Sequence, residues 1–177
     1  TNVNVEWTLD PTLLLDEKDY EVVIAEPRNQ GRYLLLYTRS RDENIVVFAD
    51  RIAKERDLKV VEISLQIKHF YKHKMAYDAG IEEFLALVRD ADCVVTNSFH
   101  GSIFSILFKK DFYTFTRPNC STKIDFLLSR LGLKSRLYSD PNAVLDRPID
   151  YMQVYSLLQK ERKKSLTYLK NALEIKE

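Results

Sequence analysis

The segment DCVVTNSFHGSIFSILFKKDF, residues 92–112, contains the pattern that decides the fold. Its residues Cys93–Val95 form a short apolar run with two β-branched side chains, which is typical of a strand buried on both faces. Residues 96–102 are mostly polar, and residues 103–108 are again apolar, as in a short buried helix that ends before Lys109. The sequence therefore predicts a strand, a polar turn and a helix, which together make half of a βαβ unit.

The polar turn would lie at the carboxyl end of its strand, where open α/β sheets bind their ligands. The free N–H groups in the first turn of the following helix make this place suited to an anion. Gly101 would let a ligand approach the backbone, and His100 would add a donor that can also carry a proton. The residues alone leave an alternative open, in which Asn97 and Ser98 only cap the helix and His100 is a hydrogen-bonded core residue.

Strands and helices alternate along the rest of the chain. Short apolar runs predict strands at Tyr33–Tyr37, Leu58–Ile63, Cys93–Val95, Phe112–Phe115 and Arg136–Tyr138. Apolar residues recur at helical spacing within residues 44–56, 80–88, 122–131 and 149–175. The first strand, helix and strand form a βαβ unit, which requires a parallel pair and a right-handed crossover. The alternation predicts an α/β fold, a Rossmann-like three-layer sandwich with a mainly parallel sheet.

The same patterns divide the chain. We expect residues 1–32 to be a linker or N-terminal extension that packs on the domain, with Leu13–Leu15 as its apolar patch. Residues 33–177 would form the domain itself, which ends in a long helix. Within that helix the basic run Lys160–Lys164 is most simply a solvated face.

Residues 64–79 give the weakest structural signal, because lysines and histidines are mixed there with aromatic residues. His69 and His73 would share one face of a helix, which is the spacing of a possible pair of metal ligands. No acidic or cysteine ligand accompanies them, and the neighbouring lysines would oppose a cation. We therefore predict no metal site here, and interpret the stretch as a solvated or substrate-facing loop.

Composition narrows the possible functions. The chain has 177 residues and a net charge of +1, which argues against nucleic-acid binding by bulk electrostatics. Its two cysteines, Cys93 and Cys120, form neither a disulfide framework nor a zinc-binding spacing, which favours a cytoplasmic location. No apolar run reaches the ~20 residues needed to cross a bilayer. Because the chain begins at Thr1, we expect it to be a fragment or a processed form.

The central segment resembles the signature of a known family. The hexapeptide TNSFHG, residues 96–101, followed by FSILFKKDF, residues 104–112, is similar to the signature of polysaccharide pyruvyltransferases. The segment DPTLLL, residues 10–15, also resembles a stretch that these enzymes carry upstream of their C-terminal half. The resemblance extends through nearly the whole chain in the right order, and its most specific part is Ser98–Gly101.

The resemblance implies a fold and an activity. The family folds as two Rossmann-like domains that face each other across a cleft, similar to the glycosyltransferase-B arrangement. This chain would be the C-terminal half, and the N-terminal domain of the same enzyme is missing from the sequence. The implied reaction transfers pyruvyl from phosphoenolpyruvate to two hydroxyls of a saccharide acceptor, giving a cyclic ketal and phosphate, without a cofactor. It would take place in the cytoplasm, with peripheral association with the membrane where glycan precursors are assembled as an alternative.

The resemblance also implies roles for the residues of the polar turn. His100 would be the catalytic residue, either as the proton donor to the vinyl carbon or as a ligand of the phosphate. The N–H groups of Ser98 and Gly101 would contact the phosphate, and Asn97 would fix the turn. Ser102 would be a further substrate-binding residue.

Three basic residues complete the candidate site. Arg39 or Arg41, at the end of an adjacent strand, would hold the carboxylate of the donor. The alternative is a surface arginine that is ion-paired with Asp42 or Glu43. Lys123 lies where many relatives are expected to have an arginine, so the cation is kept while the bidentate geometry is lost.

Two other functions remain open. One is the nucleotide-sugar domain of a glycosyltransferase of the same architecture, although such domains usually have a glycine-rich turn and this chain has only four unclustered glycines. The other is a binding module that has no activity on its own. If the chain is half of a two-domain enzyme, it should be inactive as this fragment alone.

Overall fold

The described part of the chain folds around one parallel sheet. The structure is a computed structural model that describes residues 6–26, 31–40, 42–64, 72–116 and 121–173. The strands are β1 (Tyr33–Tyr37), β2 (Lys59–Ile63), β3 (Lys74–Met75), β4 (Cys93–Thr96), β5 (Asp111–Phe115) and β6 (Leu137–Tyr138). They lie in the order β3-β2-β1-β4-β5-β6, and every neighbouring pair is parallel. The predicted parallel sheet is confirmed.

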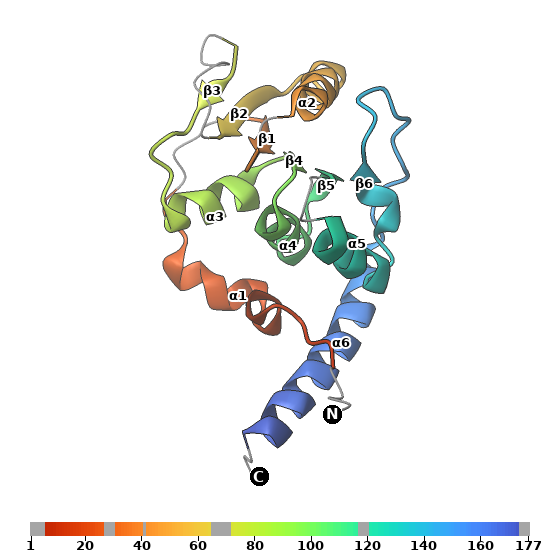
Figure 1. Cartoon of the computed structure of the whole chain (residues 1–177). Coiled ribbons are helices and arrows are strands. Elements are labelled where there is room, and N and C mark those ends of the chain that lie inside the picture. The colour runs from red at the N-terminus through yellow and green to blue at the C-terminus, as the bar shows by residue number, and fades with distance from the viewer. Residues whose placement is uncertain (1–5, 27–30, 41, 65–71, 117–120, 174–177) are drawn as a thin grey trace.

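Helices cover both faces of this sheet. The α-helices are α1 (Glu17–Tyr20), α2 (Glu43–Glu55), α3 (Ile81–Asp90), α4 (Phe99–Leu107), α5 (Ser121–Arg130) and α6 (Tyr151–Ala172). Short 3₁₀ helices span Pro11–Leu14, Glu21–Val23 and Lys134–Arg136. Figure 1 shows α2 on one side of the sheet and α3, α4 and α5 on the other, with the far half of α6 projecting from the body. The α/β three-layer architecture is therefore as the sequence predicts.

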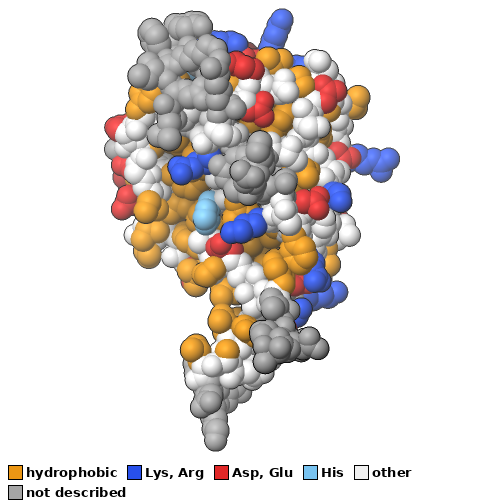
Figure 2. All heavy atoms as spheres, in the orientation of Figure 1, with side chains coloured by type: hydrophobic (Ala, Val, Ile, Leu, Met, Phe, Trp, Pro, Cys, Tyr) orange, Lys and Arg blue, Asp and Glu red, His pale blue; other side chains and the backbone are white. Residues whose placement is uncertain are grey.

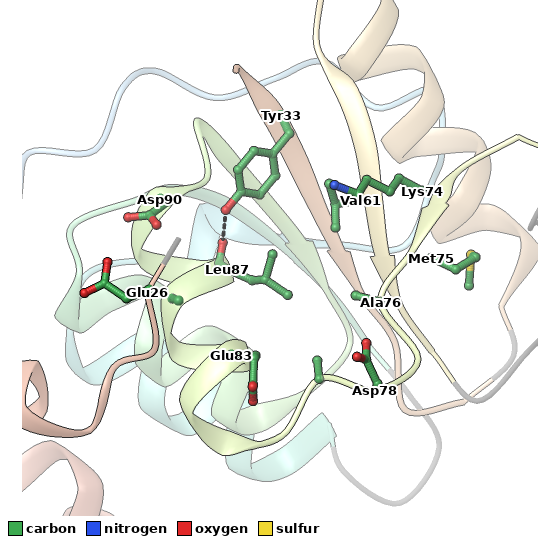
Figure 3. A pocket seen from close by; sticks show the side chains of 12 residues that line it. Glu26, Tyr33, Val61, Lys74, Met75, Ala76, Asp78, Glu83, Leu87 and Asp90 are labelled. Atoms are coloured by element: carbon green, nitrogen blue, oxygen red, sulfur yellow. Dashed lines mark hydrogen bonds between the residues drawn. The ribbon is translucent and has the colours of Figure 1, made fainter. Parts of the chain in front are cut away.

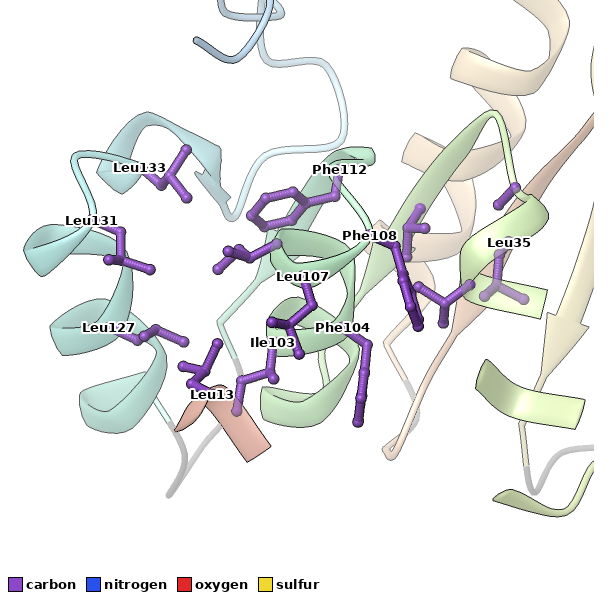
Figure 4. Close-up of a cluster of buried hydrophobic side chains, with 14 of the residues drawn as sticks. Leu13, Leu35, Ile103, Phe104, Leu107, Phe108, Phe112, Leu127, Leu131 and Leu133 are labelled. Carbon is purple, nitrogen blue, oxygen red and sulfur yellow. The ribbon is translucent and has the colours of Figure 1, made fainter. Parts of the chain in front are cut away.

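The central strands bury both of their faces, as their apolar runs predict. Leu35 of β1 and Val94 of β4 belong to the core beneath α3, α4 and α5. Leu34 and Val95, their neighbours along the strands, belong to the second core beneath α2. Successive side chains of a strand point to opposite faces, so continuous apolar runs are required when helices cover both. Figure 4 shows the larger core, in which Leu13 of the N-terminal segment meets side chains of α4 and α5.

The N-terminal segment is fastened to the rest of the fold by α6. Leu13 is fully buried, and the N–H of Leu9 donates a hydrogen bond of 2.9 Å to the hydroxyl of Ser165. The guanidinium of Arg162 donates to the carbonyls of Leu13 and Leu15 and pairs with Asp16. The prediction of a solvated face was therefore wrong for Arg162, whose planar group of donors satisfies backbone carbonyls that would otherwise be buried without partners.

A charged network closes the amino-terminal edge of the sheet. Asp111, at the start of β5, accepts hydrogen bonds from Arg56 at 2.7 Å and from Arg136 at 2.8 Å. Arg56 also donates to the hydroxyl of Tyr113 at 2.6 Å. These groups join the end of α2 to β5 and to the turn before β6. The opposite, carboxyl edge of the sheet is where the candidate site lies.

Candidate functional site

The site lies where the sheet reverses its strand order. From β1 the chain proceeds outward to β2 and β3, and it then returns to build β4, β5 and β6 on the other side of β1. Tyr37 and Thr96, the last residues of β1 and β4, are paired neighbours. In open α/β sheets the loops after two such strands diverge to opposite faces, which makes this topological switch point the preferred place for a ligand.

Asn97 joins the two loops at this point. Its side-chain oxygen accepts a hydrogen bond of 2.8 Å from the backbone N–H of Arg39, and its amide nitrogen donates to the carbonyl of Ser40 at 3.2 Å. The residue is completely buried. The role expected of Asn97, to fix the turn, agrees with these contacts, because they hold the ends of β1 and β4 in one position.

The helix after β4 begins earlier than the sequence predicts. The apolar run suggested a start at Ile103, whereas α4 begins at Phe99. Ser98 is the N-cap, and its hydroxyl accepts a hydrogen bond of 3.3 Å from the N–H of Gly101. A helix tolerates polar residues in its first turn once a cap satisfies the backbone, so the polar stretch does not mark a loop. His100 and Gly101 therefore lie in the first helical turn.

The backbone N–H groups of this turn differ in their partners. That of Ser98 donates to the hydroxyl oxygen of Thr96 at 3.0 Å, and that of Gly101 is held by the cap. The N–H groups of Phe99 and His100 have no hydrogen-bond partner among the described residues, as is usual at the first positions of a helix. At the start of α4, the N–H groups of Phe99 and His100 are therefore the ones without a protein partner among the described residues.

Gly101 has a packing role that the sequence did not indicate. A Cβ at this position would lie 2.4 Å from the hydroxyl oxygen of Thr96 and 3.0 Å from a ring carbon of Tyr37. The missing side chain thus allows α4 to approach the ends of β4 and β1. The space over Gly101 is filled by protein, whereas the sequence suggested room for a ligand.

Replacing Gly101 with alanine should lower the free energy of unfolding by about 1–2 kcal/mol. The close contact with Thr96 should cost about 2–3 kcal/mol, offset by the ~1 kcal/mol that alanine gains over glycine in a helix. Urea denaturation measures the difference. An unchanged stability for Gly101→Ala would contradict the packing role.

Ser102 lies behind the turn. Its hydroxyl is 2.9 Å from the hydroxyl of Thr114 and donates to the carbonyl of Ser98 at 3.2 Å. The residue is completely buried. Ser102 therefore joins α4 to β5, and its contacts lie within the protein.

His100 is the polar residue of the turn that faces outward. Its side chain is 55% exposed, so it is not a core histidine. Its Nε2 atom lies 3.9 Å from Oδ2 of Asp10, and its ring lies against that of Phe99 with the centroids 5.7 Å apart. The side chain is therefore accessible at the N-terminus of α4.

The described basic residues of the predicted site, Arg39 and Lys123, follow the two strands that lie on either side of β4. Arg39 follows β1 and is exposed, and Lys123 is exposed in the first turn of α5, directly after the loop that follows β5. Arg41 lies outside the described residues. Since β1, β4 and β5 are adjacent, the ends of these strands bring Arg39, His100 and Lys123 to one edge of the sheet. Figure 2 shows one face of the molecule, on which a histidine lies between positively charged side chains, with an acidic side chain beside it and hydrophobic side chains around it.

Asp10 lies beside His100, and sequence reasoning missed this contact. The sequence places it in a turn of an N-terminal extension, far along the chain from His100. The signal that could have indicated it was the DPTLLL segment, which forms part of the family resemblance. The contact brings a carboxylate within ion-pairing distance of the imidazole of His100.

The other described histidine has a structural position. The side chain of His73 is only 1% exposed, with Nδ1 2.5 Å from the carboxylate of Glu62 and Nε2 2.9 Å from that of Asp50. The prediction of a solvated or substrate-facing loop was therefore wrong at His73, which is buried against two carboxylates distant in sequence. His69 lies outside the described residues, and within the described ones no cluster of three or more potential ligands could hold a metal ion.

Two hollows in the described part of the chain lie away from His100. A cavity of about 100 Å³ lies among β1, β3 and α3, where the hydroxyl of Tyr33 donates to the carbonyl of Leu87 at 2.8 Å (Figure 3). It is smaller than the ~300 Å³ at which ligand pockets usually begin. A groove of about 830 Å³ runs between α1, α6 and the far end of α4, beside Leu107 and Tyr151. His100 lines neither of these two hollows.

The fold and this edge define a class of protein: a Rossmann-like α/β domain with a histidine and basic side chains at its topological switch point. The family model for "Polysaccharide pyruvyl transferase" matches residues 1–119. The chain therefore belongs to the polysaccharide pyruvyl transferase family, as its central segment predicts. Within the described residues, no helix is both long enough and apolar enough to cross a membrane.

Solved structures give more distant matches, and no curated protein matches. One is the UDP-GlcNAc 2-epimerase of Methanocaldococcus jannaschii, with 16% identity, a TM-score of 0.46 and coverage of 86% of this chain and 42% of that one. Another is the glycosyltransferase SnogD of Streptomyces nogalater, with 13% identity, a TM-score of 0.41 and coverage of 92% and 42%. The chain spans less than half the length of these proteins.

Proposed function

We propose that this chain is the donor-binding half of a polysaccharide pyruvyltransferase that uses phosphoenolpyruvate. The observation that carries the proposal is the position of His100. In a chain of this family, an exposed imidazole lies at the N-terminus of α4, at the switch point of a parallel sheet. Helix N-termini bind phosphate through free N–H groups and the helix dipole, and an imidazole can add a charge and a proton.

The proposed reaction sets clear requirements. The methylene carbon of phosphoenolpyruvate gains a proton and becomes a methyl group, which leaves an oxocarbenium-like centre at the neighbouring carbon. One sugar hydroxyl adds to this centre, phosphate leaves, and the second hydroxyl closes the ketal. Of the two hydrogens that the sugar gives up, the methyl group accounts for one and the phosphate for the other. The enzyme must supply an acid, neutralise phosphate and hold the carboxylate.

The residues of the site divide these tasks. The N–H groups of Phe99 and His100 would bind the phosphate, since those of Ser98 and Gly101 donate within the protein. The ring of His100 would neutralise the phosphate or protonate the methylene carbon. Arg39 and Lys123 would hold the remaining negative charge, including the carboxylate. Asn97 would keep the ends of β1 and β4 in place for this purpose.

The acceptor saccharide would bind chiefly to the other half of the enzyme. In this proposal the second wall of the cleft would come from the N-terminal domain that the family resemblance implies. The isolated chain should therefore bind the donor without transferring pyruvyl. Release of phosphate by the 177-residue chain together with an acceptor would refute this division of labour.

Isothermal titration calorimetry should show that the chain binds phosphoenolpyruvate and does not bind uridine diphosphate. A donor with a phosphate and a carboxylate can satisfy both the helix N-terminus and the basic side chains, whereas the site lacks a clustered glycine turn for a diphosphate. The His100→Ala variant, titrated in the same way, controls for binding elsewhere on the surface. Binding of uridine diphosphate without phosphoenolpyruvate would overturn the proposal in favour of a nucleotide-sugar domain.

A further inference from the structure

The N-terminal segment places a carboxylate directly beside the candidate catalytic histidine. Oδ2 of Asp10 lies 3.9 Å from Nε2 of His100. Asp10 precedes the 3₁₀ helix Pro11–Leu14, while His100 lies in the first turn of α4. The contact thus joins two segments that are distant in the chain.

The orientation of this carboxylate is fixed by its own turn. Its Oδ1 atom accepts hydrogen bonds from the backbone N–H of Thr12 at 3.0 Å and from the hydroxyl of Thr12 at 2.6 Å. Capping of this kind restrains the side chain. With Oδ1 committed to Thr12, Oδ2 is the oxygen that remains directed toward His100.

The backbone that carries Asp10 is also held from both sides. On one side of it Leu9 donates to Ser165, and on the other Leu13 is fully buried and its carbonyl accepts from Arg162. Both partners belong to α6. Asp10 is therefore part of a rigid support, and α6 sets its distance from α4.

We infer that Asp10 is a positioning residue for His100, whose carboxylate, within ion-pairing distance of Nε2, keeps the imidazole at the N-terminus of α4. The inference rests on the proposed function, in which that ring meets phosphoenolpyruvate. A half-exposed ring can adopt several rotamers. A neighbouring carboxylate favours the rotamers that bring the ring toward it, which reduces the entropy that the side chain loses when the donor binds.

The charges around His100 support a specific role for Asp10. Among the described residues, Asp10 is the charged group within ion-pairing distance of the ring. On its own helix the ring contacts Phe99, which is uncharged. Removal of the Asp10 charge therefore removes the direct electrostatic partner of the imidazole, while Arg39 and Lys123 remain at the sheet edge.

The test begins without any ligand. Long-range ¹H–¹⁵N NMR of the 177-residue chain detects the two ring nitrogens of each histidine. In Asp10→Asn and Asp10→Ser the ring-nitrogen shifts of His100 should change, while those of His73, buried between Asp50 and Glu62, should not. Asparagine and serine preserve the N-cap of the 3₁₀ helix, so the fold should persist in both variants. Glu17→Gln is the matched control, because it removes one charge from the same segment and its partner is Lys109.

The second arm measures phosphoenolpyruvate affinity by calorimetry. We expect the affinity of both Asp10 variants to fall about two- to fivefold, as for a half-exposed ion pair, and that of Glu17→Gln to stay unchanged. Asp10→Glu should restore part of the loss, which a merely structural role would not allow. If the Asp10 variants match Glu17→Gln in the His100 signals, the inference is wrong. If wild type binds no phosphoenolpyruvate, the proposed function fails, and the ring-nitrogen shifts still decide the role of Asp10.

Discussion

Replacing His100 with alanine should lower the rate of pyruvyl transfer by the full-length enzyme about a hundredfold or more. A positioned general acid typically contributes 10²- to 10⁴-fold, and loss of a phosphate contact adds to that effect. The fold should survive, because the side chain is 55% exposed and little apolar area is lost. Phosphate release measures the rate, and urea denaturation measures the stability of the same variant.

A second substitution separates the two possible tasks of the histidine. His100→Gln keeps a hydrogen-bond donor for the phosphate and removes the acid. If the ring only binds phosphate, glutamine should recover much of the activity that alanine loses. If the ring protonates the methylene carbon, glutamine should bind the donor and remain as slow as alanine. An alanine variant that is fully active, or that unfolds while the folded remainder binds the donor normally, would remove His100 from the mechanism.

The sheet could be predicted from sequence because its strands are buried on both faces. Continuous apolar runs such as Leu34–Leu36 and Val94–Val95 indicate buried parallel strands when helical patterns alternate with them. The strand β3 was missed, since the two residues Lys74–Met75 carry no periodicity and pair only at the edge. The start of α4 was placed too late because polar residues in a capped first turn look like a loop.

The candidate site could be predicted only in part, because some of its residues are brought together by tertiary packing rather than by neighbouring positions in the sequence. Local chemistry marks His100, Asn97 and Ser98, because a strand, a cap and a helix follow one another in the chain. Asp10 reaches the site only through tertiary packing, in which α6 fastens the N-terminal segment beside α4. The buried position of Arg162 has the same origin. The spacing and periodicity of the sequence do not indicate the contact of Asp10 with His100 or that of Arg162 with the N-terminal segment.

Replacing the buried histidine, His73, is the second change from which we expect a large effect, in this case on the stability of the fold. Burial alone would lower the pKa of His73, but hydrogen bonds to Asp50 and Glu62 raise it from 6.5 to about 9. Glu62 is itself 1% exposed, and its other oxygen accepts from the hydroxyl of Ser64 at 2.8 Å. Burial opposes ionisation of Asp50 as well, and its bonds to His73 and Lys72 prevail and lower its pKa. The imidazolium thus offsets the cost of burying the Glu62 carboxylate and also pairs with the partly exposed Asp50.

The sign of the pH effect follows from the raised pKa. The folded protein binds the His73 proton more tightly than the unfolded chain, so this stabilisation is complete below pH ~6.5 and is lost as pH rises through about 9. At ~1.36 kcal/mol for each pKa unit, the full contribution is about 3 kcal/mol. The lowered pKa of Asp50 acts at the acidic end of the pH range. The stability that this carboxylate provides is present above its ordinary pKa of 3.8 and is lost as the pH falls below that value.

Urea denaturation of wild type and of His73→Gln between about pH 5.5 and 10 should therefore give converging curves. Near pH ~6 the variant should be less stable by about 3 kcal/mol, because glutamine leaves Glu62 with a neutral partner in a buried place. The gap should narrow between pH 6.5 and about 9 as wild type loses its proton. His100→Gln, which removes a half-exposed ring elsewhere, controls for the loss of a histidine as such. Parallel curves for wild type and His73→Gln across this range would show that the buried ring is not held in its charged form. The contacts of His73 with Asp50 of α2 and Glu62 of β2 would then stabilise the fold as neutral hydrogen bonds.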